Sequence, residues 1–179
     1  MHFKDLTPYT YMARYSEYGA KNIGWLKAGE DFPKNPPDDD LLDALWETIK
    51  HPAIRTRGMH RCDQCNKKIR EERYKNQTLL LGSNEIRIFH KEGDIFAAPN
   101  MIFHYVYIHH YNPPLKFREA VLYCAQNLDW YKSKSNDHIQ LCEENPLNLV
   151  RIPDSVKRSW LRRGVSPLKT PPTKAEEPQ

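Results

Sequence analysis

Residues 62–65 read Cys62-Asp63-Gln64-Cys65, and a later segment carries His104 and His109. Two cysteines separated by two residues form a knuckle that can hold one metal ion from two sides. Two imidazoles on one later segment can complete a shell of four ligands. Thiolate and imidazole ligands together select tetrahedral Zn²⁺ over Mg²⁺ or Ca²⁺. We therefore predict that a zinc ion joins the knuckle to a helix carrying both histidines.

The five-residue step from His104 to His109 falls within the range of such pairs, but it does not suit an ideal helix. Five residues turn an ideal helix by about 500°, so the two rings would diverge by about 140°. We therefore expect the helix to loosen near Ile108. His60, two residues before Cys62, could replace either histidine or support a ligand without binding the metal itself, and His110 could exchange with His109.

The predicted ligand set favours a structural ion over a catalytic one. Two thiolates and two imidazoles close the shell, whereas catalytic zinc usually keeps three protein ligands and a nearby general base. His60 is not followed two residues later by Glu, as it would be in zinc deaminases. Cys124 and Cys142 are single cysteines in helix-like stretches, and we expect both to be small buried apolar residues.

Hydrophobic spacing around these motifs predicts an α+β fold. Asp38, Asp39 and Asp40 open the clearest helix, because one of them can cap it and all three favour the positive end of its dipole. Pro99 suits the first turn of another helix. The fold we expect is a small antiparallel sheet flanked by helices and stapled by zinc. Its strands are predicted at 78–81, 85–89 and 94–98, and its helices at 39–50, 99–110 and 114–128.

The composition suggests one metal-stabilised domain with additions. We predict a zinc-binding domain over residues 1–130, with the Tyr- and Pro-rich segment 6–18 as an extended arm packed on it. A helical C-terminal extension is predicted over 131–165, including a linker at 133–136. Residues 166–179 are rich in Pro, which predicts disorder.

Charge is balanced in the body and basic in the tail. The net charge is +4, yet residues 1–150 hold 20 basic and 20 acidic residues. A nucleic-acid-binding body usually carries a basic face of its own, so a protein partner is preferred. The alternative is a nucleic-acid-binding zinc-finger protein. The arginines that could contact phosphates are Arg57, Arg61, Arg158, Arg162 and Arg163.

Several classes of protein are disfavoured. The sequence has no apolar leader and no apolar run long enough to span a membrane, so we expect the protein to make no membrane contact. We expect it to be located in the reducing cytoplasm, where thiols stay free to bind metal. It has no glycine-rich phosphate loop, nucleophile elbow or dinucleotide fingerprint. The favoured function is a non-enzymatic binding module, such as an adaptor or an immunity-type protein. A zinc-dependent hydrolase or nuclease with His60 near an open site is the second alternative.

Four stretches together resemble a family of small, uncharacterised bacterial proteins. In that family a Gly-x-His-x-Cys-x-x-Cys stretch precedes His-Tyr-Val-x-x-His and then Tyr-x-Pro-Pro. The resemblance covers roughly residues 5–125, supports Cys62, Cys65, His104 and His109 as ligands, and implies no activity. The stretches that carry it are residues 22–26, 57–65, 81–87 and 98–114.

Overall fold

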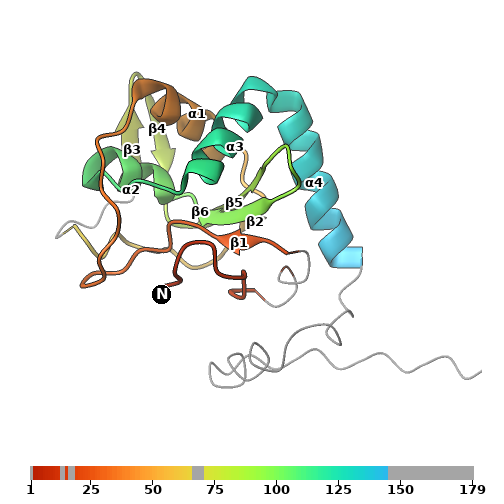
Figure 1. Cartoon of the computed structure of the whole chain (residues 1–179), viewed down its shortest axis with the longest axis horizontal. Helices are drawn as coiled ribbons and strands as arrows, with labels where there is room; N and C mark the ends of the chain where they lie inside the picture. The colour runs from red at the N-terminus through yellow and green to blue at the C-terminus, as the bar shows by residue number, and fades with distance from the viewer. Residues whose placement is uncertain (1, 13–14, 16–18, 66–70, 145–179) are drawn as a thin grey trace, which may run out of the picture.

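The computed structural model describes residues 2–12, 15, 19–65 and 71–144. Strands and helices alternate irregularly along the chain, as expected for an α+β protein (Figure 1). The strands are β1 (Lys21–Asn22), β2 (Ile54–Arg55), β3 (Glu71–Tyr74), β4 (Gln77–Leu80), β5 (Asn84–Phe89) and β6 (Ile95–Pro99). The helices are α1 (Asp39–Ile49), α2 (Ile102–His109), α3 (Leu115–Gln126) and α4 (Leu128–Glu144).

The strands form two separate sheets. The larger sheet has the order β1-β6-β5-β2, and β3 pairs with β4 in a hairpin of its own. The predicted α+β class is confirmed, but the prediction of one antiparallel sheet over residues 78–98 is wrong in two respects. The first predicted strand is β4, which pairs with β3 and not with β5. The larger sheet is also mixed, because β1 runs parallel to β6.

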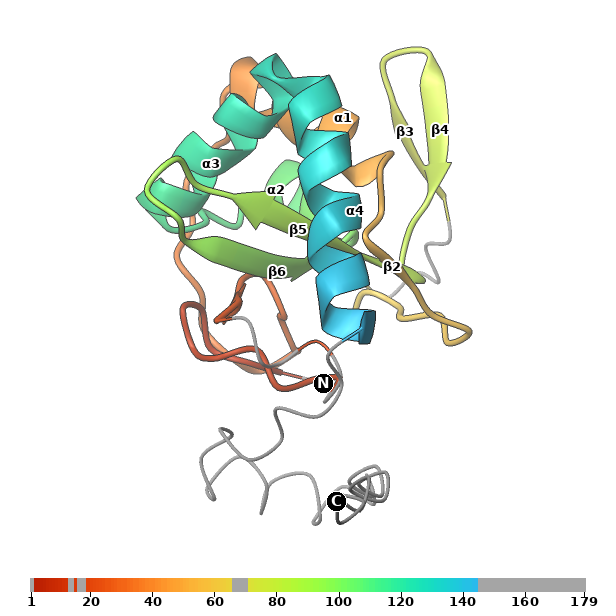
Figure 2. The ribbon, with the colours of Figure 1, turned by 90° about the vertical axis from the view of Figure 1, so that its right-hand side faces the viewer.

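The larger sheet buries both of its faces. Ile86, Ile88 and Phe96 point toward the helices, whereas Arg87 and Ala97 point to the opposite face, as the two-residue period of a strand requires. Figure 2 shows α1 and α3 on one side of the sheet and the N-terminal segment on the other. The described part of the predicted N-terminal arm therefore packs on the domain, and Tyr9 stacks its ring against the guanidinium group of Arg87.

Helix α1 follows the sequence prediction closely. Asp38 is the N-cap, and its side chain accepts a hydrogen bond of 2.7 Å from the backbone N–H of Leu41. The apolar residues at spacings of three and four are all buried against the sheet and α3. They are Leu41, Leu42, Leu45, Trp46 and Ile49.

Two local predictions are wrong. Pro99 does not begin a helix, because it is the last residue of β6 and α2 starts three residues later. The linker predicted at 133–136 lies inside α4, which passes residue 131 without a break. Tyr131, Ser135 and His138 are buried at helical spacing along α4, and this explains why a polar sequence stays helical there.

Residues 145–165 of the predicted extension and the tail predicted to be disordered at 166–179 lie outside the described residues. The same is true of Arg158, Arg162 and Arg163. Among the described helices, no segment has both the length and the apolar character needed to cross a membrane.

Candidate metal centre

The knuckle is held by a close contact with the turn between β4 and β5. The backbone N–H of His60 donates a hydrogen bond of 2.6 Å to the carbonyl oxygen of Gly82. Gly82 has a φ of +93°, and a Cβ atom there would lie 2.1 Å from the carbonyl oxygen of His60. Only glycine permits both this backbone conformation and this close approach. The backbone N–H of Gly82 also donates a hydrogen bond to the side-chain oxygen of Asn100, which lies just before α2. The chain is therefore fixed on both sides of the candidate site.

Helix α2 brings the two histidines together by widening at its end. The N–H groups of His110 and Tyr111 both donate to the carbonyl oxygen of Tyr105, five and six residues back instead of four. His110 closes the helix in the left-handed conformation, with a φ of +56°. The predicted loosening near the end of this helix is thereby confirmed. The ring centroids of His104 and His109 lie 5.0 Å apart.

The structure gathers the four predicted side chains into one cluster, called here the four-donor cluster: Cys62, Cys65, His104 and His109. One donor atom from each lies within 4.8 Å of every other, which is close enough to bind one metal ion. Cys65 Sγ is 3.3 Å from His104 Nε2 and 3.1 Å from His109 Nε2, and Cys62 Sγ is 3.2 Å from His109 Nε2. A tetrahedral zinc site with ordinary bond lengths has sulfur–nitrogen edges of about 3.5 Å. The cluster therefore has nearly the size that a tetrahedral ion requires.

Burial and local charges shift the pKa of two members of the cluster, Cys62 and His109. Burial raises the pKa of the Cys62 thiol to about 11, while the backbone N–H groups of Gln64 and Cys65 hydrogen-bond its sulfur and act in the opposite direction. Burial also lowers the pKa of His109, and the nearby His104 and Lys34 lower it further. This shift favours the neutral imidazole of His109, which is the form that can bind a cation. A bound dication would deprotonate the thiols.

Glu72 is a hydrogen-bond partner of the four-donor cluster that the sequence did not reveal. Its carboxylate Oε2 accepts a hydrogen bond of 2.6 Å from Nδ1 of His104, and its side chain is only 12% exposed. Because Nδ1 carries the proton, Nε2 presents its lone pair toward the cluster, where Cys65 Sγ lies 3.3 Å away. Metal-binding histidines commonly have such a carboxylate partner, which fixes the tautomer and the ring orientation. Glu72 lies in a charged run with little apolar pattern, so no sequence signal distinguished it from a solvated residue.

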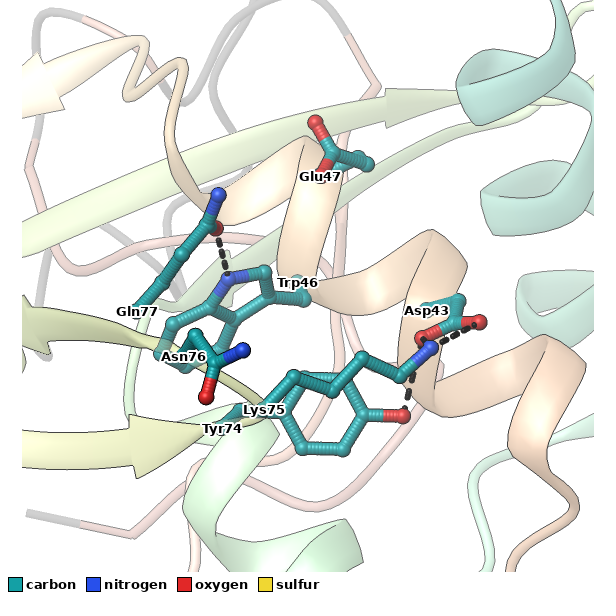
Figure 3. Close-up of a pocket in the computed structure, with 7 residues that line it drawn as sticks. All are labelled: Asp43, Trp46, Glu47, Tyr74, Lys75, Asn76 and Gln77. Carbon is teal, nitrogen blue, oxygen red and sulfur yellow. Dashed lines mark hydrogen bonds and ion pairs between the residues drawn. The ribbon is translucent and has the colours of Figure 1, made fainter.

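The β3–β4 hairpin that carries Glu72 is held on α1 beside a hollow of about 450 Å³ (Figure 3). There the indole N–H of Trp46 donates to the side-chain oxygen of Gln77 at 2.7 Å, and the hydroxyl of Tyr74 donates to Asp43 at 2.9 Å. Lys75 adds a hydrogen bond to the same carboxylate. Because these polar groups pair with one another across the hollow, they fix the position of the hairpin and thereby that of Glu72.

The other residues considered from sequence lie outside the four-donor cluster. His60, Arg57 and Arg61 are exposed, and His60 is not one of the clustered donors. Cys124 and Cys142 are fully buried, as predicted for small apolar residues. Sulfur Sγ of Cys124 donates a hydrogen bond of 3.5 Å to the carbonyl oxygen of Phe89, away from the knuckle.

Comparison of the chain with curated proteins and with solved structures gave no match. A family model does match, over residues 1–122, and this span includes the four-donor cluster and Glu72. The match agrees with the expected membership of an uncharacterised family. The chain belongs to the family described as Domain of unknown function (DUF7919).

Proposed function

We propose that this protein is a non-enzymatic protein-interaction module, an adaptor or an immunity-type protein, whose fold is stabilised by one Zn²⁺ ion in the four-donor cluster. The observation that carries the proposal is the convergence of two thiols and two imidazoles from segments about 40 residues apart in sequence. Sulfur and imidazole ligands in tetrahedral arrangement suit Zn²⁺ better than hard cations.

A structural role for the ion follows from the ligand count. Four protein ligands fill a tetrahedral shell and leave no position for a water molecule or a substrate. His60, which the hydrolase or nuclease alternative places near an open site, is exposed and is not one of the clustered donors. These observations favour the structural ion over the zinc hydrolase or nuclease alternative.

The stabilisation can be estimated from the chain that the ion would close. A bond between Cys62 and His109 closes a loop of 48 residues. In the chain-entropy treatment used for disulfides, such a link is worth about 4 kcal/mol. That is a large share of the ~5–15 kcal/mol by which natural domains are stable. Removal of the ion is therefore expected to unfold much of the domain.

An exposed aromatic pair supports the interaction role. Tyr123 on α3 and Trp130 on α4 are 37% and 41% exposed, and their ring centroids lie 5.3 Å apart in an edge-to-face arrangement. Trp and Tyr dominate the energetically important positions of protein interfaces. Arg57 and Arg61 are also exposed beside the knuckle, and this is the observation that favours nucleic-acid binding as the second candidate.

The metal proposal is tested by elemental analysis and by unfolding with a chelator. We expect one zinc per chain in the wild-type protein and in Cys142→Ser, and loss of both zinc and cooperative unfolding in Cys62→Ser. Cys142 is the matched control because it is a buried cysteine outside the cluster. Retention of stoichiometric zinc by Cys62→Ser would overturn the assignment of the ligands.

The interaction proposal is tested by affinity capture after nuclease treatment. A protein that is retained by the wild-type chain and lost from a Tyr123→Ser/Trp130→Ser variant with normal zinc content would support it. Capture of nucleic acid alone, with an affinity that falls steeply as salt is added, would replace it with the nucleic-acid alternative.

A further inference from the structure

A second concave site lies where the end of α1, β2 and α4 meet, and we call it the basic hollow. Its volume is about 290 Å³. Its walls come from residues 50–55 on one side and from α4 on the other, so it extends beyond the segment that matches the family model. It is lined by Lys50, His51, Pro52, Arg55, Lys132, Ser135 and Asn136.

The lining of the basic hollow is chemically one-sided. Apart from Pro52, every side chain that lines it can donate a hydrogen bond, and three carry a permanent positive charge. No described carboxylate lines it. Glu47 and Asp129 pair with Lys50 and Lys132 from outside the lining. Arg55 is exposed, and none of the described side chains forms a hydrogen bond or ion pair with it.

The walls of the basic hollow are held in place by the fold. The hydroxyl of Tyr131 on α4 donates to the carbonyl oxygens of Thr48 and His51 at 3.4 Å each. On the other wall, Arg55 belongs to β2, which is paired with β5. Ser135, which also lines the hollow, is only 4% exposed. Burial lowers the pKa of His51, and the nearby Lys132 and Lys50 lower it further, while Glu47 acts in the opposite direction.

We propose that the basic hollow is a binding site for the phosphoryl group of a small phosphate monoester. A tetrahedral dianion can accept hydrogen bonds from Lys50, Arg55 and Lys132 and from the hydroxyl of Ser135. Hydrogen bonds between charged groups are stronger than those between neutral groups. The volume lies at the lower limit of small-molecule pockets, about 300 Å³. It therefore suits a phosphoryl group with a short substituent and not a bound polynucleotide. This site is independent of the four-donor cluster.

The test is a titration of the full-length protein with glycerol phosphate and with inorganic phosphate, followed by amide chemical shifts. Both ligands are added up to about 20 mM, a range that captures even weak millimolar binding. We expect saturable shifts at His51, Arg55, Ser135 and Asn136. Arg55→Gln and Lys132→Gln should each weaken binding about tenfold, the effect of losing one charge-assisted contact. Both residues are at least partly exposed, so the variants are expected to fold normally.

Lys134→Gln is the matched control, because Lys134 is an exposed lysine on the same helix that does not line the hollow. It should change the affinity less than about twofold, since screening by salt weakens distant charges. Three results would overturn the proposal. They are an absence of saturable shifts, an equal loss of affinity in Lys134→Gln, and binding of duplex DNA at these residues without binding of either phosphate.

Discussion

Substitution of Glu72 offers the most direct test of how the four-donor cluster is organised. Glu72→Gln keeps the shape of the side chain but removes its charge, and Glu72→Ala removes the acceptor entirely. In the structure this carboxylate is the hydrogen-bond partner of His104 Nδ1, at 2.6 Å, and its side chain is mostly shielded from water. Loss of such a partner typically lowers metal affinity by about 10- to 100-fold.

We expect Glu72→Gln to weaken Zn²⁺ binding about tenfold and Glu72→Ala up to about 100-fold, which corresponds to about 1.4 and 2.7 kcal/mol. The amide oxygen of Gln can still accept the Nδ1 proton, so the smaller loss belongs to that variant. Affinity is measured by competition with a chromophoric chelator at neutral pH. The absorption spectrum of the Co²⁺-substituted protein reports whether the site stays tetrahedral.

Glu71→Gln is the control, since Glu71 is the exposed neighbour of Glu72 on β3 and the substitution removes the same charge. It should leave Zn²⁺ affinity within about twofold of the wild-type value, because exposed charges interact weakly. If both Glu72 variants bind zinc as tightly as Glu71→Gln, the carboxylate does not orient His104. If the wild-type protein binds no zinc at all, the zinc proposal itself is wrong.

Three further outcomes are expected. Gly82→Ala should lower the free energy of unfolding by at least about 2 kcal/mol, measured by thermal unfolding, and should weaken zinc binding. Gly93 also has a positive φ but has open space around it, so Gly93→Ala should lower the same free energy by only about 1–2 kcal/mol. Burial lowers the pKa of His138 to about 4, so the unfolded chain binds a proton at this residue before the folded protein does as the pH falls below about 6.5. The free energy of unfolding, measured with denaturant, should therefore fall by about 2 kcal/mol between neutral pH and pH 5. His138→Gln should remove this part of the pH dependence. Leu45→Ala should lower the free energy of unfolding in denaturant by about 2–5 kcal/mol, because this side chain is fully buried. Leu80 is exposed, so Leu80→Ala should lower it by less than about 0.5 kcal/mol. Equal losses in the two variants would refute the assigned core.

The four-donor cluster could be predicted from sequence because its signal is chemical and local. Two thiols two residues apart and two imidazoles five apart restrict the possible geometry, and the structure brings all four side chains together. Helix α1 was predictable for a similar reason, since its cap and its apolar spacing both lie within a few residues. The identity of the ion as Zn²⁺ stays a prediction.

The features that were missed depend on contacts between distant segments. The strand β3 has a single apolar residue, Tyr74, and becomes a strand because it pairs with β4 and packs on α1. Helix α4 buries Ser135 and His138 against the body, and a sequence pattern treats such residues as polar. Glu72 acquires its role only when the hairpin is placed beside His104.

The hairpin of β3 and β4 also determines how the protein can open locally. Its backbone ladder is separate from that of the larger sheet, and its described hydrogen bonds to α1 and α2 run through the side chains of Tyr74, Lys75, Gln77 and Glu72. Detaching the hairpin breaks these hydrogen bonds and the ring contacts of Tyr74 but leaves the central ladder whole, so this opening costs less free energy than global unfolding. Such an opening would separate Glu72 from His104 and leave the four donor side chains in place, because none of them belongs to the hairpin.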